Sequence, residues 1–332
     1  MKVCVVGSGA WGTALAIRLH QNGHDVTMWT FEKDLIPEME STRCNPRLPG
    51  AMLPEGLKIS GDYACNRGSK LVVIASPSFP MRSVCRGAAP FIDPDAVVVS
   101  VTKGIEDSTC KRMSEIVAEE TGKQVVVLSG PSHAEEVALN VPTGCLAACE
   151  DQSLAEFVQN AFMSDTFRIY TSSDPMGAEL GAALKNVIAL CAGVCDGLGY
   201  GDNTKAMLMT RGLTEIARLG VAMGARRDTF AGLTGVGDLI VTCTSMHSRN
   251  RRAGILIGQG KDVQTAMKEV GAVVEGYYAA KSAWALAQKM GVDMPITEAA
   301  YKVLYEGLEA RSVTRELLLR SRKAESEDAG WL

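Results

Sequence analysis

The chain opens with MKVCVVGSGAWG, residues 1–12, and this stretch decides the fold. A β-branched run at residues 2–6 enters a glycine-rich turn, and a helical pattern follows at residues 13–20. Together they predict a strand, a tight loop and a helix. A second strand is predicted at residues 25–30, so the glycine pattern lies in the context that makes it informative.

Three glycines in this loop have distinct roles. Gly7 permits the tight turn, Gly9 lets a backbone approach a pyrophosphate, and Gly12 allows the helix to pack close to the strand. The free N–H groups and the positive dipole end of the helix favour a dianionic linker. The loop therefore predicts a binding site for a dinucleotide.

The residues leave the choice between NAD and NADP open. The ribose 2′ position is normally read about 20 residues further on, at the end of the second strand. Glu32 has a spacing suited to accepting a hydrogen bond from a 2′-hydroxyl, whereas Lys33 or Arg43 would hold a 2′-phosphate. An equally good interpretation is that Glu32 and Lys33 are solvated loop charges.

Length and composition fit a globular protein of two domains. The chain has 332 residues, of which 46% are hydrophobic and 22% are charged, and a single core rarely extends over such a length. The net charge of −4 and the isoelectric point near 5.7 argue against a nucleic-acid partner, since such a protein needs a basic surface.

The ten cysteines and four histidines favour neither a disulfide framework nor a metal site. No CxxC pair occurs, the cysteines lie mostly in apolar runs, and the histidines lack metal-ligand spacing. No signal peptide precedes the first strand, and no apolar stretch reaches transmembrane length. We therefore expect reduced thiols, no metal, no membrane span and a cytoplasmic location. The sequence is compatible with a homodimer, but no residue pattern identifies the oligomeric state.

Strand-like and helix-like segments alternate after the glycine loop. Short apolar runs bounded by Gly, Pro and Ser predict a mostly parallel sheet with helices on both faces. These runs are residues 70–75, 96–101 and 124–129, and residues 144–149 and 166–170 are further candidates. The fold class expected is α/β, a Rossmann-type sheet followed by an all-α domain.

The pattern changes near residue 175. Asp174 and Pro175 form a good N-cap and first helical position, and from there the chain is helical in pattern to about residue 322. The expected units are a dinucleotide-binding domain at 1–175, a helical substrate-binding domain at 176–325 and a polar tail at 326–332.

Ligands of α/β sheets bind beyond the carboxyl ends of the strands. Lys103 follows one predicted strand, and Gly130 and Ser132 follow the next. Lys103 would deliver a cation to a substrate there, although a loop lysine is often a plain surface charge.

Lys185 is a lone cation in an apolar, small-residue helical segment. At helical spacing its neighbours on the same face are Ala178, Ala182 and Ala189 among others, so that face should be closely packed. Burial lowers the pKa of an ammonium, which suits a group that gives and takes a proton near neutrality. The alternative is a lysine whose head reaches water.

Two further groups lie in residues 233–252. Asp238, in an apolar, glycine-rich setting, is either a helix cap or an ionic partner for Lys185. Ser248, Arg249 and Asn250 precede a helical run, so their backbone N–H groups and the guanidinium would make a phosphate site. A solvated basic turn is the alternative there.

Together these segments resemble the bacterial type of NAD(P)-dependent glycerol-3-phosphate dehydrogenase over nearly the whole chain. The matching motifs, in order, are GSGAWGTALA from Gly7, VTKGIE from Val101, SGPSHAEE from Ser129, GAALKNVIA from Gly181, LTGVGDLIVTCTSMHSRNRRAG from Leu233, VVEG from Val273 and MPITEAAYKVLY from Met294. Several separate motifs in one order are far more specific than the glycine loop alone.

The resemblance implies two sets of residues. Dinucleotide contacts would come from Ala10, Trp11, Phe31, Lys103, Ala134, Arg249, Val273 and Glu275, beside Gly7, Gly9 and Gly12. The substrate would be lined by Lys103, Gly130, Ser132, Lys185, Asn186, Asp238, Thr242, Ser248, Arg249 and Asn250. Phe31 stands where such proteins often have a polar residue, which weakens any inference about the 2′ group.

The implied reaction is the reversible reduction of dihydroxyacetone phosphate to sn-glycerol 3-phosphate with NAD(P)H. Lys185 would be the proton donor and acceptor, Asp238 would orient it, and Lys103 would polarise the same end of the substrate. The family also implies supply of glycerol phosphate for phospholipid synthesis. The alternatives are a 6-phosphogluconate or hydroxyacid dehydrogenase of the same architecture and a non-catalytic NAD(P) redox sensor.

Overall fold

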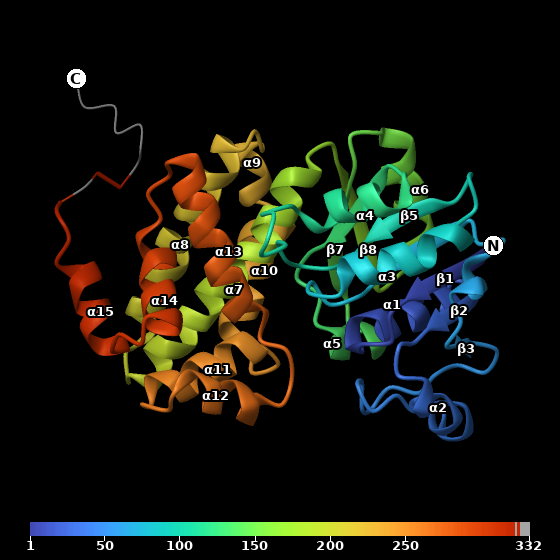
Figure 1. The fold of residues 1–332 in the computed structure, drawn as a ribbon, viewed down its shortest axis with the longest axis horizontal. Coiled ribbons are helices and arrows are strands. Elements are labelled where there is room, and N and C mark those ends of the chain that lie inside the picture. The colour runs from blue at the N-terminus through green and yellow to red at the C-terminus, as the bar shows by residue number, and fades with distance from the viewer. Residues whose placement is uncertain (323, 326–332) are drawn as a thin grey trace.

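The computed structural model describes residues 1–322, 324 and 325, so the predicted polar tail at 326–332 lies outside the described residues. An eight-stranded sheet forms one part of the molecule and a helical bundle forms the other (Figure 1). This confirms the expected fold class. The strands are β1 (Lys2–Val6), β2 (Asp25–Trp29), β3 (Lys58–Ser60), β4 (Leu71–Ile74), β5 (Val97–Ser100), β6 (Val125–Ser129), β7 (Thr143–Ala148) and β8 (Phe167–Ser172).

The strand order is β3-β2-β1-β4-β5-β6-β7-β8. All neighbouring pairs are parallel except β6 and β7. The chain leaves β1 in one direction for β2 and β3 and returns to its other side for β4. The sheet therefore has its topological switch between β1 and β4, where ligands of such sheets bind.

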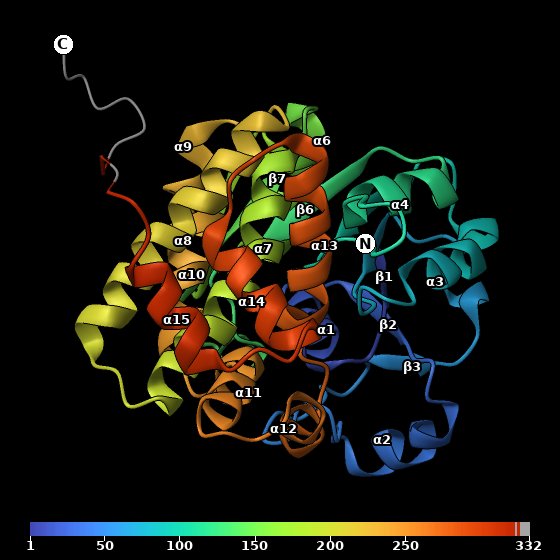
Figure 2. The same ribbon diagram turned by 60° about the vertical axis from the view of Figure 1, so that its left-hand side comes forward.

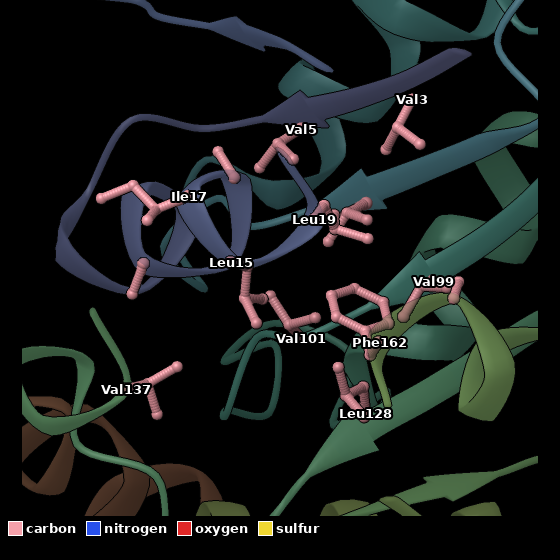
Figure 3. Close-up of a cluster of buried hydrophobic side chains, with 14 of the residues drawn as sticks. Val3, Val5, Leu15, Ile17, Leu19, Val99, Val101, Leu128, Val137 and Phe162 are labelled. Atoms are coloured by element: carbon pink, nitrogen blue, oxygen red, sulfur yellow. The ribbon is translucent and has the colours of Figure 1, made fainter. Parts of the chain in front are cut away.

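Helices cover both faces of the sheet. They are α1 (Ala10–Gln21), α2 (Ile36–Thr42), α3 (Met81–Ala88), α4 (Met113–Thr121), α5 (Ala134–Ala138) and α6 (Gln152–Phe162), with 3-10 turns η1 (Lys33–Leu35), η2 (Tyr63–Asn66) and η3 (Ala89–Phe91). Alternate residues of β1 serve the two faces, since Val3 and Val5 pack with α1 and α6, while Cys4 and Val6 pack with α3 and α4. Figure 3 shows the first of these cores.

The helical part follows Ser172. It comprises α7 (Pro175–Gly197), α8 (Asp202–Ala222), α9 (Arg227–Phe230), the π-helical turn η4 (Leu233–Gly237), α10 (Asp238–Thr244), α11 (Arg249–Gly258), α12 (Val263–Val270), α13 (Glu275–Met290), α14 (Pro295–Tyr305) and α15 (Ala310–Leu318). Helices α8, α10, α11, α13 and α14 all contact α7 (Figures 1 and 2). Helix α7 is therefore the centre of this part.

Helix α7 also joins the two parts. Asp174 caps it, its carboxylate accepting from the backbone N–H of Gly177 at 2.9 Å. Near its start, Ala178 packs on Val127 and Ala148 of the sheet. By length and composition α7 could cross a membrane, which corrects the expectation that no apolar stretch is long enough, but 94% of its most apolar window is buried inside the protein.

Two features of the sheet differ from the sequence expectation. Strand β3 was not predicted, because its three residues are too few to show a period. Strand β7 runs antiparallel to β6, because an apolar run identifies a strand without giving its direction.

Candidate active site

The glycine loop has the geometry that a dinucleotide needs. Gly7 has a φ of +132°, and a Cβ there would meet the Ala75 carbonyl oxygen at 2.5 Å. A Cβ on Gly12 would meet the Gly7 oxygen at 2.1 Å, whereas one on Gly9 would meet nothing within 4 Å. Two glycines are therefore required by the fold itself. Gly9, exposed before α1, leaves open space for a ligand.

Lys185 lies in α7 with only 4% of its surface exposed. Its Nζ lies 3.1 Å from Asp238 Oδ1 and donates to Thr242 Oγ1 at 2.6 Å and to Asn186 Oδ1 at 3.3 Å. Burial lowers the pKa of Lys185 to about 8, although the charge of Asp238 opposes this shift. A group with this pKa can both hold and release a proton near neutral pH.

Asp238 serves two lysines at once. It begins α10, directly after the π-helical turn η4, and is 1% exposed. Its Oδ2 lies 2.7 Å from Lys103 Nζ, while its Oδ1 faces Lys185. Of the two interpretations left open by the sequence, the structure supports an ionic partner for Lys185.

Lys103 and Gly130 come together beyond the ends of β5 and β6. Lys103 Nζ donates to the Gly130 carbonyl oxygen at 3.0 Å, and Ser132 Oγ donates to the same oxygen at 3.1 Å. The side chain of Lys103 is 21% exposed, so Lys103 is less buried than Lys185. Two ammonium groups share the single Asp238 carboxylate, which leaves an excess of positive charge for an anion.

His133 lies next to this charge. The pKa of His133 is lowered by burial and by the charges of Lys185 and Lys103. Its Nε2 is buried without a hydrogen-bond partner in the described part of the chain. His133 was not predicted as a site residue, although it lies between Ser132 and Ala134, which both were.

Asn186 and Asn250 connect three helices beside Lys185. Asn250 Nδ2 donates to Asn186 Oδ1 at 2.9 Å, and the Gly276 N–H of α13 donates to Asn250 Oδ1 at 2.8 Å. Both asparagines are buried. These bonds occupy the amide of Asn250, so its side chain positions the helices.

The first turn of α11 combines a cap with a free guanidinium. Ser248 Oγ accepts from the Arg251 N–H at 3.2 Å. Arg249 is exposed, and its side chain has no hydrogen bond or ion pair within residues 1–322. The N–H groups of Arg249 and Asn250 are in the first turn, where helix amides lack intrahelical acceptors. This turn can hold an anion.

Glu275, another residue predicted to contact the cofactor, connects the helical part to the sheet. Glu275 begins α13, and its Oε2 accepts from Ser78 Oγ at 2.9 Å. Burial raises the pKa of Glu275, and the Ser78 hydrogen bond and the Arg249 charge oppose the shift. Ser78, which follows β4, thus ties the sheet to the helical part and was missed in the sequence, although it follows a predicted strand.

The structure places the other predicted residues as follows. Phe31 is 81% exposed after β2, and Ala134 is buried at the start of α5. Val273 is partly buried just before α13, and Ala10 and Trp11 form the first turn of α1.

The comparisons with known proteins agree over both parts. Residues 2–155 match the family model of the NAD-dependent glycerol-3-phosphate dehydrogenase N-terminus, and residues 174–315 match that of the C-terminus. A glycerol-3-phosphate dehydrogenase [NAD(P)+] of Fusobacterium nucleatum is 51% identical over 330 residues, covering 98% of each chain.

Solved structures give the same result. The crystal structure of glycerol-3-phosphate dehydrogenase from Coxiella burnetii is 38% identical, covers 96% of this chain and 99% of its own, and has a TM-score of 0.92. A PanE/ApbA family ketopantoate reductase from Ralstonia eutropha covers 96% of this chain and 100% of its own, with 15% identity and a TM-score of 0.62. That second likeness concerns the fold alone.

Proposed function

This chain belongs to the NAD-dependent glycerol-3-phosphate dehydrogenase family, and we propose that Lys185 is its proton donor and acceptor. The protein is an NAD(P)-dependent oxidoreductase that reversibly reduces dihydroxyacetone phosphate to sn-glycerol 3-phosphate. The observation that supports the role of Lys185 is its buried cluster with Asp238 and Lys103. Lys185 is the only buried lysine among the described residues, and its pKa is lowered to about 8.

The residues of the glycine loop would hold the dinucleotide, with Gly9 facing the pyrophosphate. When bound, the reduced cofactor supplies the hydride that carbon C2 of the ketone accepts. The remaining work falls to the protein, which must hold the ketone and supply a proton to its oxygen. Pre-positioned donors that meet a developing negative charge are the most effective means of doing so.

Lys185 would donate that proton to the C2 oxygen. Its three N–H bonds now point to Thr242, Asp238 and Asn186. The Asn186 bond is the longest and has a neutral acceptor, so it is the one to be exchanged for the substrate oxygen. Asp238 would hold the ammonium in place, and Lys103 would stabilise charge at the same end of the substrate.

Arg249 and the backbone at Asn250 would bind the phosphate. The free guanidinium and the first-turn amides of α11 support this assignment. Ser248 contributes as the cap that fixes the turn. When the phosphate is held, the C2 carbonyl has a fixed position relative to Lys185. The binding energy of the phosphate thus serves to orient the reacting group.

We propose that residues 1–175 form the dinucleotide-binding domain and that residues 176–325 form the substrate-binding domain. The change from the last strand at Ser172 to helix α7 at Pro175 supports this division. We also propose a cytoplasmic location, a homodimer, no nucleic-acid partner and a supply of glycerol phosphate for phospholipid synthesis. The ten cysteines are free thiols, which fits a reducing compartment.

The deciding experiment measures initial rates with dihydroxyacetone phosphate, once with NADH and once with NADPH. We expect turnover with at least one of them. We expect no turnover of 6-phosphogluconate or simple hydroxyacids, which are alcohols and are therefore offered with NAD+ or NADP+ as the hydride acceptor. Cofactor binding without any turnover would instead support a redox sensor.

A further inference from the structure

An ion pair lies just beyond the end of β2. The Arg47 guanidinium contacts both carboxylate oxygens of Glu32, through Nη2 to Oε1 and through Nε to Oε2 at 3.3 Å. The two side chains are 54% and 37% exposed. Exposed pairs of this kind are usually worth little to stability, so stability alone does not account for it.

Hydrogen bonds tie this pair to the glycine loop. Ser8 Oγ donates to Thr30 Oγ1 at 2.6 Å, and the Glu32 N–H donates to the same Thr30 oxygen at 3.2 Å. On the other side, Asn45 Nδ2 donates to the Ser8 carbonyl oxygen at 2.9 Å, and Asn45 Oδ1 accepts from the Arg47 N–H at 2.9 Å.

The three linking residues Ser8, Thr30 and Asn45 are buried. A closed ring of hydrogen bonds thus runs from the glycine loop to both members of the ion pair. Because buried polar groups rigidify a structure when all are satisfied, Glu32 and Arg47 are held in place relative to the loop that would take the pyrophosphate.

The end of β2 is where a bound dinucleotide presents its ribose 2′ position. A carboxylate there accepts a hydrogen bond from a 2′-hydroxyl. A 2′-phosphate would meet the negative charge of Glu32 and would have to separate Arg47 from it. The sequence offered Lys33 and Arg43 for a 2′-phosphate, and of these Arg43 donates to the carbonyl oxygens of Leu53, Pro54 and Leu57 instead.

We propose that Glu32, held by Arg47, makes this protein bind NAD(H) more tightly than NADP(H). The proposal rests on the dinucleotide site of the proposed function and adds the selectivity that the sequence left open. Arg47 has two effects, since it orients Glu32 and also places a cation near the 2′ position. Its pairing with Glu32 keeps that cation from a phosphate.

The test measures dissociation constants of NADH and NADPH by titration calorimetry, with no substrate present. We expect the wild-type protein to bind NADH at least about tenfold more tightly, since a hydrogen bond to a charged group is lost and a like charge is met with NADPH. Glu32→Gln should shrink this ratio about tenfold. Glu40→Gln is the control, because Glu40 is exposed on α2 and its change alters the net charge equally.

Arg47→Ala should weaken the binding of NADH, since it removes the group that holds the Glu32 carboxylate in place. Competition by 5′-AMP and by 2′,5′-ADP probes the same position without the nicotinamide half, and the wild-type protein should prefer 5′-AMP. Equal affinities for NADH and NADPH, or a ratio unchanged in Glu32→Gln, would overturn the proposal. Failure of the proposed function is a separate outcome, namely NADH binding without turnover of dihydroxyacetone phosphate.

Discussion

Lys185 and Asp238 form an ion pair 3.1 Å long in which both side chains are almost fully buried. The pair joins α7, the central helix of the helical part, to α10. A buried ammonium without a carboxylate would lose its proton readily. Asp238 thus allows Lys185 to stay charged in a place that burial makes unfavourable, and that balance gives a proton donor suited to neutral pH.

Lys185→Ala should abolish turnover and leave cofactor binding intact. Losing a positioned proton-transfer group lowers the rate by about 10²–10⁴. The fold should survive, because Asp238 keeps Lys103 as its partner at 2.7 Å. The measurement is kcat with dihydroxyacetone phosphate together with the Kd of NADH.

Lys289→Ala is the matched control, since Lys289 is exposed in the last turn of α13. It should leave both quantities unchanged. A near-normal kcat in Lys185→Ala would remove Lys185 from the mechanism.

The pH dependence should follow the pKa of Lys185, which is about 8. Reduction of the ketone needs the protonated ammonium, so kcat/KM should fall as the pH rises through this value. Asp238 raises the pKa of Lys185 and Lys103 lowers it. Asp238→Asn should therefore move the fall to lower pH, and Lys103→Met should move it to higher pH.

These opposite shifts are measured as changes in the pH at which kcat/KM falls, so they do not depend on the absolute rate of each variant. Oxidation of glycerol 3-phosphate needs the neutral amine and should show the reverse trend, rising with pH. If kcat/KM of both variants fell at the same pH as in the wild-type protein, the titrating group would be another residue.

The fold and the catalytic lysine could be expected from the sequence because each has a strong local signal. The glycine spacing of the first loop and the lone cation of α7 both lie in regular elements with a clear period. The alternatives for Asp238 remained open, since sequence spacing places it in α10 but does not say what faces it. Only packing brings it to Lys185 and Lys103.

Other pairs of residues could not be predicted, because they lie in irregular segments or far apart in the sequence. Arg47 reaches Glu32 across 15 residues of turns and short helix, and no periodicity connects them. Ser78 and Glu275 are 197 residues apart in the sequence. Such pairs form only when distant segments pack together, so a local pattern carries no sign of them.

Arg249→Ala should raise KM for dihydroxyacetone phosphate and reduce the preference over unphosphorylated dihydroxyacetone. A charge-assisted phosphate contact contributes about 1.5–3 kcal/mol, which is about tenfold to a hundredfold in kcat/KM. Both substrates are needed, because a folding defect would lower the two rates equally.

Arg252→Ala provides the comparison, since Arg252 is exposed on the same helix. A surface arginine should change neither parameter beyond about twofold. An unchanged preference in a well-folded Arg249→Ala protein would move the phosphate site elsewhere, with Lys103 as the next candidate.

Gly9→Ala and Gly12→Ala should separate binding from stability within one loop. A Cβ on Gly9 meets no protein atom within 4 Å, so Tm should be unchanged while the Kd of NADH rises, because the methyl group occupies the space for the pyrophosphate. A Cβ on Gly12 would meet the Gly7 oxygen at 2.1 Å, so α1 must move from the sheet and Tm should fall. Thermal unfolding and calorimetric titration of both variants provide the measurements. Wild-type NADH affinity in Gly9→Ala would show that the pyrophosphate does not pass over this residue, whatever Gly12→Ala does to the fold.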